Sequence, residues 1–358
     1  MSAIIARGRA AGRRLSPTAI VYIALLGVLL VGGILVATVG RNLLSAGNIR
    51  DILTGMSVLG FVAIGQSLVV LCGSLDLSVP YVISLTSLLA ADLMRGSAAN
   101  IAVAVLVALA VAAVIGLLNG LIVTKLKVHG FITTLGMGLI VKGYLDTNYK
   151  GTSGDVPWEF QLIGATGIGP VPVSTIIMLA VAVLAALMLS RTRIGNHMFA
   201  VGGNEQVARL SGIRTASPVV LAHVLCSLTA AFAGLLLASR LGVGSPTVGP
   251  QGGYDLLSIA AVVLGGTLLT GGRGSIWGTI GGVAIFAVLD NVMSVLQVNP
   301  FAKDIVRGIV IVAAVVVYTS RQVERRRARF GHAADAPPPT TGSAPPPAFV
   351  DAAKGERA

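Results

Sequence analysis

Long apolar runs with almost no charge inside them limit what this chain can fold into. The runs are roughly 16 to 24 residues long, and about 20 apolar residues are needed for an α-helix to cross a bilayer. Hydrophobic residues make up 54% of the sequence and charged residues 11%, whereas soluble domains carry about 25% charged residues. A membrane β-barrel would instead show segments of about ten residues with alternating polarity. The sequence therefore predicts an all-α polytopic membrane protein.

The apolar runs divide the chain into three parts. Residues 1–18 form a basic segment, residues 19–320 the membrane domain, and residues 321–358 a basic and then proline-rich tail that we expect to be disordered. About ten transmembrane helices are predicted, and because the third and the eighth are short, counts of nine and eleven stay open. The predicted spans are 19–39, 52–72, 79–94, 101–124, 131–147, 171–190, 218–237, 256–270, 275–296 and 302–319.

The distribution of Lys and Arg predicts the orientation of these spans. If the amino end lies in the cytoplasm, most of the 26 Lys and Arg residues fall in cytoplasmic segments, as the positive-inside rule requires. Both ends of the chain and the loop 191–217 are then cytoplasmic. The net charge of +12 therefore indicates membrane lipid, not nucleic acid, as the partner of the basic segments. A signal peptide is a weaker interpretation of the first run, which is long for one.

A few polar side chains lie within or beside the predicted spans, and they are candidates for the wall of a translocation path. The most unusual is Asp76, because an ionised carboxylate in the membrane is costly unless it faces water or finds partners. Glycine and proline on either side of it predict a break in the helix. The alternative is a tight turn in which Asp76 caps the next helix. The candidate path residues are Gln66, Asp76, Asn119, Thr134 and Asn291.

The chain carries no credible catalytic or metal-binding pattern. The P-loop pattern G-x-x-x-x-G-K-[ST] is absent, as are the zinc-protease and serine-hydrolase motifs. His223 is the one histidine expected in mid-membrane and has no obvious partner, and His129 has no second ligand at metal-binding spacing. We therefore predict no catalytic residue, no metal and no cofactor bound by this chain.

Two patterns bear on how the helices pack. Gly274, Gly278 and Gly282 recur every four residues and predict a smooth stripe against which another helix packs closely. The stretches 118–136 and 289–308 share an Asn, an apolar run and a helix start, and they run in opposite directions in the predicted topology. This indicates inverted repeats, which are common in transporters, although chance similarity of apolar helices explains it equally well.

A polar stretch, FAVGGNEQVARLSGIRT at residues 199–215, separates two long apolar runs. We expect a short helix over 205–211 within it. Asn204 is a good N-cap, Glu205 suits the positive end of the helix dipole, and Gly212 ends the helix as a left-handed residue would. The apolar side of this helix, which is suited to docking into a groove, consists of Val207, Ala208 and Leu210.

Four stretches together resemble the membrane permease subunits of bacterial ABC importers, in the ribose-type monosaccharide group of the branched-chain amino acid and sugar permeases. They are GSLDLS, NGLIVTKLKVHGFITTLG, RIGNHMFAVGGNEQVARLSGI and IAAVVLGGTLLTGGRGSIWG, in this order, within residues 45–320. Pro80, Gly130 and Asn196 depart from the residues that are usual in the family. These departures leave the particular sugar open.

The resemblance implies a function and a set of partners. A separate ATPase subunit would use ATP and Mg²⁺ and push on the permease through the short cytoplasmic helix. An extracytoplasmic sugar-binding protein would deliver the sugar, with the loop 238–255 as its expected contact. A second permease copy or a sister permease would complete the path in the bacterial cytoplasmic membrane. The residues that would couple to the ATPase are Gly202, Gly203, Asn204, Glu205, Ala208 and Gly212.

An ion-coupled secondary transporter of a small polar solute is the alternative. Such a protein needs coupling carboxylates deep in its spans. The acidic residues Asp76, Asp146 and Asp290 instead lie near span ends or turns. We therefore expect an external energy source.

Overall fold

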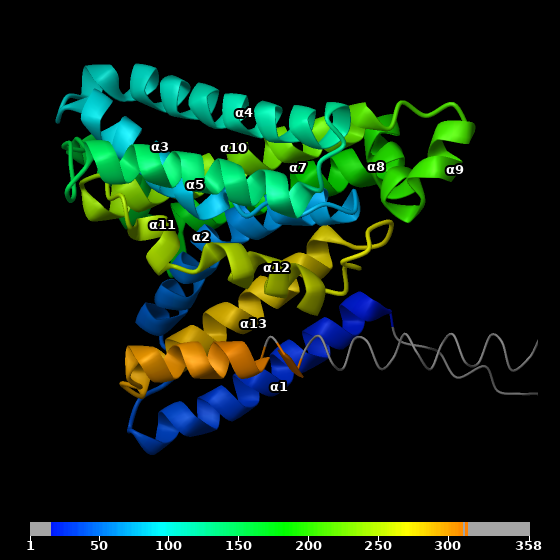
Figure 1. The fold of residues 1–358 in the computed structure, drawn as a ribbon. Coiled ribbons are helices and arrows are strands. Elements are labelled where there is room, and N and C mark those ends of the chain that lie inside the picture. The colour runs from blue at the N-terminus through cyan, green and yellow to red at the C-terminus, as the bar shows by residue number, and fades with distance from the viewer. Residues whose placement is uncertain (1–15, 311, 314–358) are drawn as a thin grey trace, which may run out of the picture. The chain divides into compact units, whose positions relative to one another are not determined.

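The computed structural model describes residues 16–310 and 312–313, and in that part of the chain nearly all regular structure is helical (Figure 1). The longer helices are α1 Pro17–Thr38, α2 Ala46–Leu71, α3 Val79–Met94, α4 Ile101–Lys125, α5 Gly130–Asn148, α7 Val173–Arg191, α10 Ala216–Leu241, α12 Tyr254–Leu264 and α13 Ile276–Val295. The short elements are η1 Ala98–Asn100, α6 Trp158–Ala165, α8 Arg193–Gly203, α9 Glu205–Leu210, α11 Val248–Gln251 and the strands β1 Gly167–Ile168 and β2 Val171–Pro172. The two strands pair antiparallel, with Gly167 opposite Pro172.

Six helices of the described chain are long and apolar enough to cross a membrane, namely α1, α2, α4 together with η1, α7, α10 and α13. The helices α3 and α12 are apolar but shorter. Each predicted span overlaps a helix of the described residues, and the tenth does so over 302–310. The eighth differs from its expected bounds of 256–270, because α12 ends at Leu264 and the chain turns through Gly266, which has φ +89°. The tail at 321–358 and the first fifteen residues lie outside the described part.

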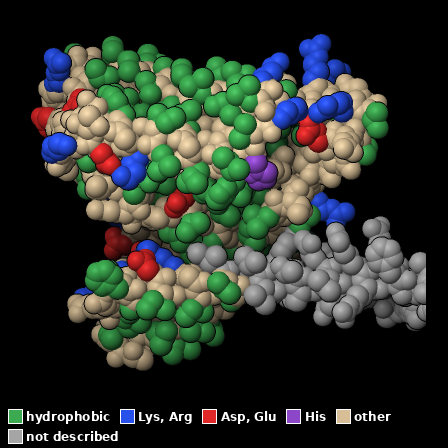
Figure 2. All heavy atoms as spheres, viewed as in Figure 1, with side chains coloured by type: hydrophobic (Ala, Val, Ile, Leu, Met, Phe, Trp, Pro, Cys, Tyr) green, Lys and Arg blue, Asp and Glu red, His purple; other side chains and the backbone are tan. Residues whose placement is uncertain are grey.

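The core is built around α2 and α10, which pack against each other. In α2 every residue from Met56 to Leu71 is buried, and α10 also packs against α3 and α4. By contrast, α1 and α4 leave many large apolar side chains exposed, including Leu30 and Leu106. Figure 2 shows hydrophobic side chains on the surface at the top of the view, where α4 lies, and at the bottom, where α1 lies. Since the chain is folded with these side chains outside, they are suited to lipid.

The glycine stripe of the ninth predicted span packs as expected. A methyl group built on Gly278 would lie 2.1 Å from the carbonyl oxygen of Gly265, and one built on Gly282 would lie 2.2 Å from that of Ala261. Gly274 makes a similar approach to the side chain of Thr267. The stripe therefore lets α13 lie against α12 and the turn that follows it with their backbones almost in contact.

The loop 238–255, the expected contact of the sugar-binding protein, is partly buried within this chain. Its first residues belong to α10, and its middle runs along α3. A methyl group built on Gly249 would lie 1.8 Å from the carbonyl oxygen of Pro80, and the Gly249 amide donates to Ser84 Oγ at 3.1 Å. Ser245 is also buried. The buried residues of this loop pack on α3, so only its exposed part is open to a partner.

The backbone contact between α12 and α13 predicts that alanine destabilises the protein at a glycine in this contact but not at a glycine in open space. Gly278→Ala forces a methyl group into the Gly265 carbonyl, so we expect a loss of about 1–3 kcal/mol in unfolding free energy. Gly136→Ala is the matched control, because open space surrounds that α5 position, and alanine there gains up to about 1 kcal/mol in helix propensity. Denaturant unfolding in mixed micelles measures both. Equal stability of the two variants would contradict this packing.

Candidate functional site

Two features of the structure are candidates for function: a capped helix pair at one end of the long helices, and a buried polar network at the break between α2 and α3. We call residues 193–212, which comprise α8, α9 and their flanking turns, the coupling segment. It lies beyond the ends of α4, α7 and α10 (Figure 1).

The local sequence explains the shape of the coupling segment. Thr192 Oγ1 accepts from the Gly195 amide at 3.1 Å and so caps α8. Asn204 ends α8 and starts α9, and its Oδ1 accepts from the Val207 amide at 3.0 Å. Gly212 follows α9 with φ +82°. The predicted N-cap and glycine stop of the short helix are therefore confirmed, whereas the helix α8 before it was not anticipated.

Glu205 ties the coupling segment to two other elements. Its Oε1 lies 2.7 Å from Arg209 Nη2 and 3.5 Å from Lys127 Nζ, and the Thr215 hydroxyl donates to it at 3.2 Å. Lys127 belongs to the turn between α4 and α5, and Thr215 precedes α10. The hydrogen bond from Arg209 lowers the pKa of the Glu205 carboxyl, and Lys127 and Thr215 add to this effect. At neutral pH the ionised carboxylate therefore holds α9 in place.

The exposed surface of α9 includes two large apolar side chains. Leu210 is 89% exposed and Val207 is 57% exposed. Ala208 differs from the prediction, since it is only 4% exposed and packs into the main core. The reason is geometric, because neighbouring residues on an α-helix point about 100° apart. Val207 and Leu210, three positions apart, share the outward side, so the face available to a partner is narrower than expected.

The buried network is centred on Asp76, which has no exposed surface. Its Oδ1 accepts from the Ser78 amide at 3.0 Å and from the Ser78 hydroxyl at 2.6 Å. Its Oδ2 lies 3.3 Å from His223 Nδ1, and the other nitrogen of that ring lies 3.2 Å from Ser74 Oγ. Asn119 Nδ2 donates to Ser78 Oγ at 3.0 Å. Both oxygens of the Asp76 side chain thus have polar partners, as a buried polar group requires.

Two further side chains hold the backbone of the same break. The Leu77 amide donates to Thr134 Oγ1 at 3.0 Å, and that hydroxyl lies 3.1 Å from the Leu75 carbonyl. In the amide orientation that satisfies both of its polar atoms, Gln66 donates to the Asp76 carbonyl at 3.2 Å and accepts from the Asp76 amide at 3.3 Å. The non-helical backbone is therefore bonded from α2 and α5, as buried backbone polar groups require.

Four of the five candidate path residues are brought together here: Gln66, Asp76, Asn119 and Thr134 all contribute to the network and are fully buried. Asn291 lies on α13, where it is buried and its Oδ1 has no hydrogen-bond partner within the described residues. Of the alternative proposed for Asp76, the turn is present, because its Oδ1 accepts from the Ser78 amide, but the N-cap of α3 is Ser78 and it makes no side-chain cap hydrogen bond.

Sequence reasoning missed the partner of His223. The expectation that this histidine stands alone is wrong, because Asp76 faces its ring from 147 positions away in the chain. Ser74, His223 and Asp76 follow the hydrogen-bond order of a hydrolase triad, but none of the three is more than 6% exposed. A substrate cannot reach Ser74 in this conformation. No group of three or more metal-ligating side chains lies together anywhere in the described ranges.

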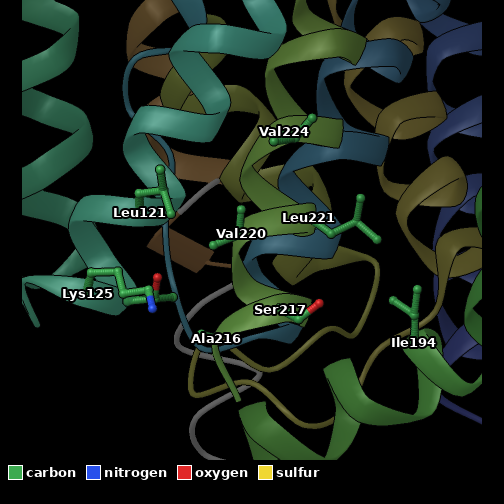
Figure 3. A pocket seen from close by; sticks show the side chains of 9 residues that line it. Leu121, Lys125, Ile194, Ala216, Ser217, Val220, Leu221 and Val224 are labelled. Atoms are coloured by element: carbon green, nitrogen blue, oxygen red, sulfur yellow. The ribbon is translucent and has the colours of Figure 1, made fainter. Parts of the chain in front are cut away.

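A hollow lies beside the coupling segment, between the end of α4 and the starts of α8 and α10 (Figure 3). Its volume is about 520 Å³. Leu121, Val220 and Val224 form apolar walls, and Lys125 lies on the α4 side (Figure 3). The hollow is therefore lined by α8 of the coupling segment and by α4 and α10. These are the two helices next to the Glu205 partners, since Lys127 follows α4 and Thr215 precedes α10.

Comparisons with known proteins decide the family. The sequence matches the family described as branched-chain amino acid transport system / permease component over residues 48–315. The chain belongs to this permease family. The matched residues include the coupling segment and every member of the buried network. No solved structure matches the permease.

Curated relatives give the same result. The permease is 40% identical to the ribose import permease protein of Escherichia coli (strain K12) over 293 residues, which cover 80% of this chain and 90% of the relative. It is 37% identical to the ribose import permease protein of Bacillus subtilis (strain 168), covering 79% and 88%. It is 32% identical to the L-arabinose transport system permease protein of E. coli (strain K12), covering 78% and 84%. The family resemblance stated from the motifs is thus confirmed, and the permease is a multi-pass protein of the bacterial cytoplasmic membrane.

The ion pairs of Glu205 predict a pH-dependent coupling segment. Folding lowers the pKa of Glu205, so its stabilising contribution is complete above the ordinary carboxyl pKa and is lost as the pH falls through the lowered value. Hydrogen exchange over residues 204–212, corrected for the intrinsic pH dependence, should lose protection in that window. In Glu205→Gln the protection should be several-fold lower at neutral pH and should no longer respond to pH there. Glu159→Gln, on α6, is the control, and an identical response of the two variants would contradict the role of Glu205.

The buried network predicts a large cost for removing its carboxylate. Asp76→Ala leaves the Ser78 hydroxyl and amide and the His223 ring nitrogen without this partner in the core, so we expect the unfolding free energy to fall by about 2–5 kcal/mol, at about 1–3 kcal/mol for each unsatisfied group. Asp146→Ala removes the exposed pair with Lys142 on α5, which contributes about 0.5 kcal/mol or less. Denaturant unfolding in micelles compares the two. A small effect of Asp76→Ala would show that the network does not hold the break.

Proposed function

We propose that this chain is the permease subunit of an ATP-binding-cassette importer that moves a monosaccharide, of the ribose type or a related sugar, across the cytoplasmic membrane by alternating access. The names of its relatives support the cargo, since they are import permeases for ribose, arabinose and galactose or methyl galactoside. The observation that carries the mechanism is the capped helix α9, which presents Val207 and Leu210 outward at one end of the long helices.

A separate ATPase subunit is the proposed partner of that helix. It binds ATP and Mg²⁺, while the permease itself binds no cofactor and performs no covalent chemistry. The exposed leucine and valine of α9 dock into a groove of the ATPase. Asn204 and Gly212 fix the ends of the helix, and Glu205 fastens it to the α4–α5 turn and to α10. A displacement of the docked ATPase is therefore passed to several long helices at once.

The proposed topology has ten spans with both chain ends in the cytoplasm. Lys125 at the end of α4, Lys127 in the next turn and Arg193 at the start of α8 lie at the end of the molecule that carries the coupling segment. The positive-inside rule then makes this the cytoplasmic end. The α4–α5 turn lies at this end and the turn after α13 at the opposite one, which supports opposite directions for the two repeated stretches.

Two more partners complete the proposed importer. A soluble sugar-binding protein meets the extracytoplasmic end, and a second permease copy or a sister permease forms the other half of the path. The five polar residues of the path, Gln66, Asp76, Asn119, Thr134 and Asn291, are buried in this conformation. Opening of the path therefore requires α2, α3, α4, α5 or α13 to move apart.

One observation favours an ion-coupled secondary transporter as the second candidate. The buried contact between Asp76 and His223 joins a carboxylate and an imidazole inside the membrane domain, and such pairs serve as proton relays in ion-driven transporters. Uptake that continues after ATP depletion and follows a proton gradient would favour this alternative.

Co-purification tests the proposed docking surface. The tagged permease is extracted in gentle detergent from a membrane that contains its importer, and bound ATPase is quantified. Leu210→Asp places a charge on the exposed face of α9, so we expect retained ATPase to fall by about tenfold, the size of a strong interface residue. Ile168→Asp, an equally polar change at the exposed β-turn near α6, is the control and should retain it. Absence of ATPase from the wild-type preparation would contradict the proposed function.

A further inference from the structure

Three backbone segments meet at a junction made almost entirely of glycine. The segments are the end of α8 at Gly202, the end of α2 at Leu71 and Gly73, and the turn after α12 at Gly271 and Gly272. We call these five residues the glycine junction. It joins the coupling segment to the break between α2 and α3 and to the turn between α12 and α13.

The segments of the junction are in direct backbone contact. A methyl group built on Gly202 would lie 1.8 Å from the Leu71 carbonyl oxygen and 2.7 Å from the Gly272 nitrogen. One built on Gly271 would lie 2.8 Å from both the Gly202 oxygen and the Gly73 nitrogen. The Gly272 amide donates to the Leu71 carbonyl at 3.0 Å. No side chain therefore separates α8 from either of the other two segments.

Each contacted segment leads directly to a functional part of the molecule. The chain passes from Gly73 into the break that holds Asp76, whose polar network closes the candidate path. It passes from Gly272 through Gly274 into α13, which carries Asn291. Met198 and Val201 of α8 are buried in the core. The last turn of α8 is therefore held against the surrounding helices.

We propose that Gly202 is the positioning residue through which motion of the coupling segment reaches the break at 72–78 and the turn at 265–275 together. This inference rests on the proposed function, because it takes the ATPase as the source of the motion. Long side chains at a contact change rotamer and absorb small displacements, whereas backbones in contact must move together or separate. A glycine is the one residue that permits this approach at Gly202.

A helical glycine outside the coupling segment supplies a matched control. A methyl group built on Gly143 of α5 meets nothing within 4 Å, so Gly143→Ala tests the loss of a helical glycine without entering the junction. Gly202→Ala forces α8 away from Leu71 and from Gly272. Both variants are compared with the wild type in the complete importer, reconstituted in vesicles with its ATPase and its sugar-binding protein.

Three quantities are measured for each variant: retained ATPase, the ATP hydrolysis rate, and sugar taken up per ATP hydrolysed. For Gly202→Ala we expect retained ATPase and hydrolysis close to wild type but about tenfold less sugar per ATP, within the usual range of coupling between sites. Gly143→Ala should stay within about twofold of wild type, as substitutions at open positions do. Normal sugar uptake per ATP in Gly202→Ala would overturn the inference. So would a parallel loss of all three quantities, because it indicates a packing role alone.

A second measurement needs no variant, so it tests the role of Gly202 even if Gly202→Ala does not fold. Hydrogen exchange of the wild-type importer is compared with and without a non-hydrolysable ATP analogue. We expect exchange over 199–204, 72–78 and 266–275 to change together, with the Gly272 amide as the reporter. A change confined to 199–204 would overturn the inference. If the wild-type permease binds no ATPase, the proposed function is contradicted. That result differs from one in which the ATPase binds but the three segments do not change together, which contradicts the role of the glycine junction alone.

Discussion

The need to satisfy backbone polar groups inside a membrane governs this structure. An unpaired amide or carbonyl in hydrocarbon costs several kcal/mol, so helices are favoured and every break must be bonded from its surroundings. At the break after α2, Asp76, Gln66 and Thr134 supply those bonds, and His223 approaches the carboxylate from α10. The same requirement places four elements, α2, α4, α5 and α10, around one short stretch of chain.

Close packing of helix backbones is the second consequence of the membrane environment. With little hydrophobic drive between helices in lipid, small residues at the contacts allow dispersion and hydrogen bonds to hold the helices together. Gly278 serves α12 and α13 in this way, and Gly202 serves α8, α2 and the turn at 265–275. Tight contacts transmit displacement, which suits a protein whose energy source is proposed to lie in another subunit. The capped helix α9 and the ion pairs of Glu205 give that subunit a firm surface on which to act.

Local signals made some of this predictable from sequence, and non-local contacts did not. Asn204 and Gly212 mark the ends of α9 because capping depends on neighbouring residues, and the four-residue period of the α13 glycines predicted their packing. The pairing of His223 with Asp76 spans 147 positions, and no periodicity reports it. The inward side chain of Ala208, the buried middle of loop 238–255 and the close approach at Gly202 likewise depend on how distant segments meet. Five polar residues were selected for a path, and tertiary packing alone shows that four share one network.

The most direct test of the account is ATP-driven sugar uptake by vesicles that contain this permease, its ATPase and its sugar-binding protein, measured with and without a protonophore. We expect uptake of a radiolabelled pentose or hexose to require ATP on the side of the membrane where the ATPase is bound. Uptake should persist when the proton gradient is collapsed. Uptake that proceeds without ATP and stops with the protonophore would contradict the account. In that case the buried contact between Asp76 and His223 would become the energy-coupling site.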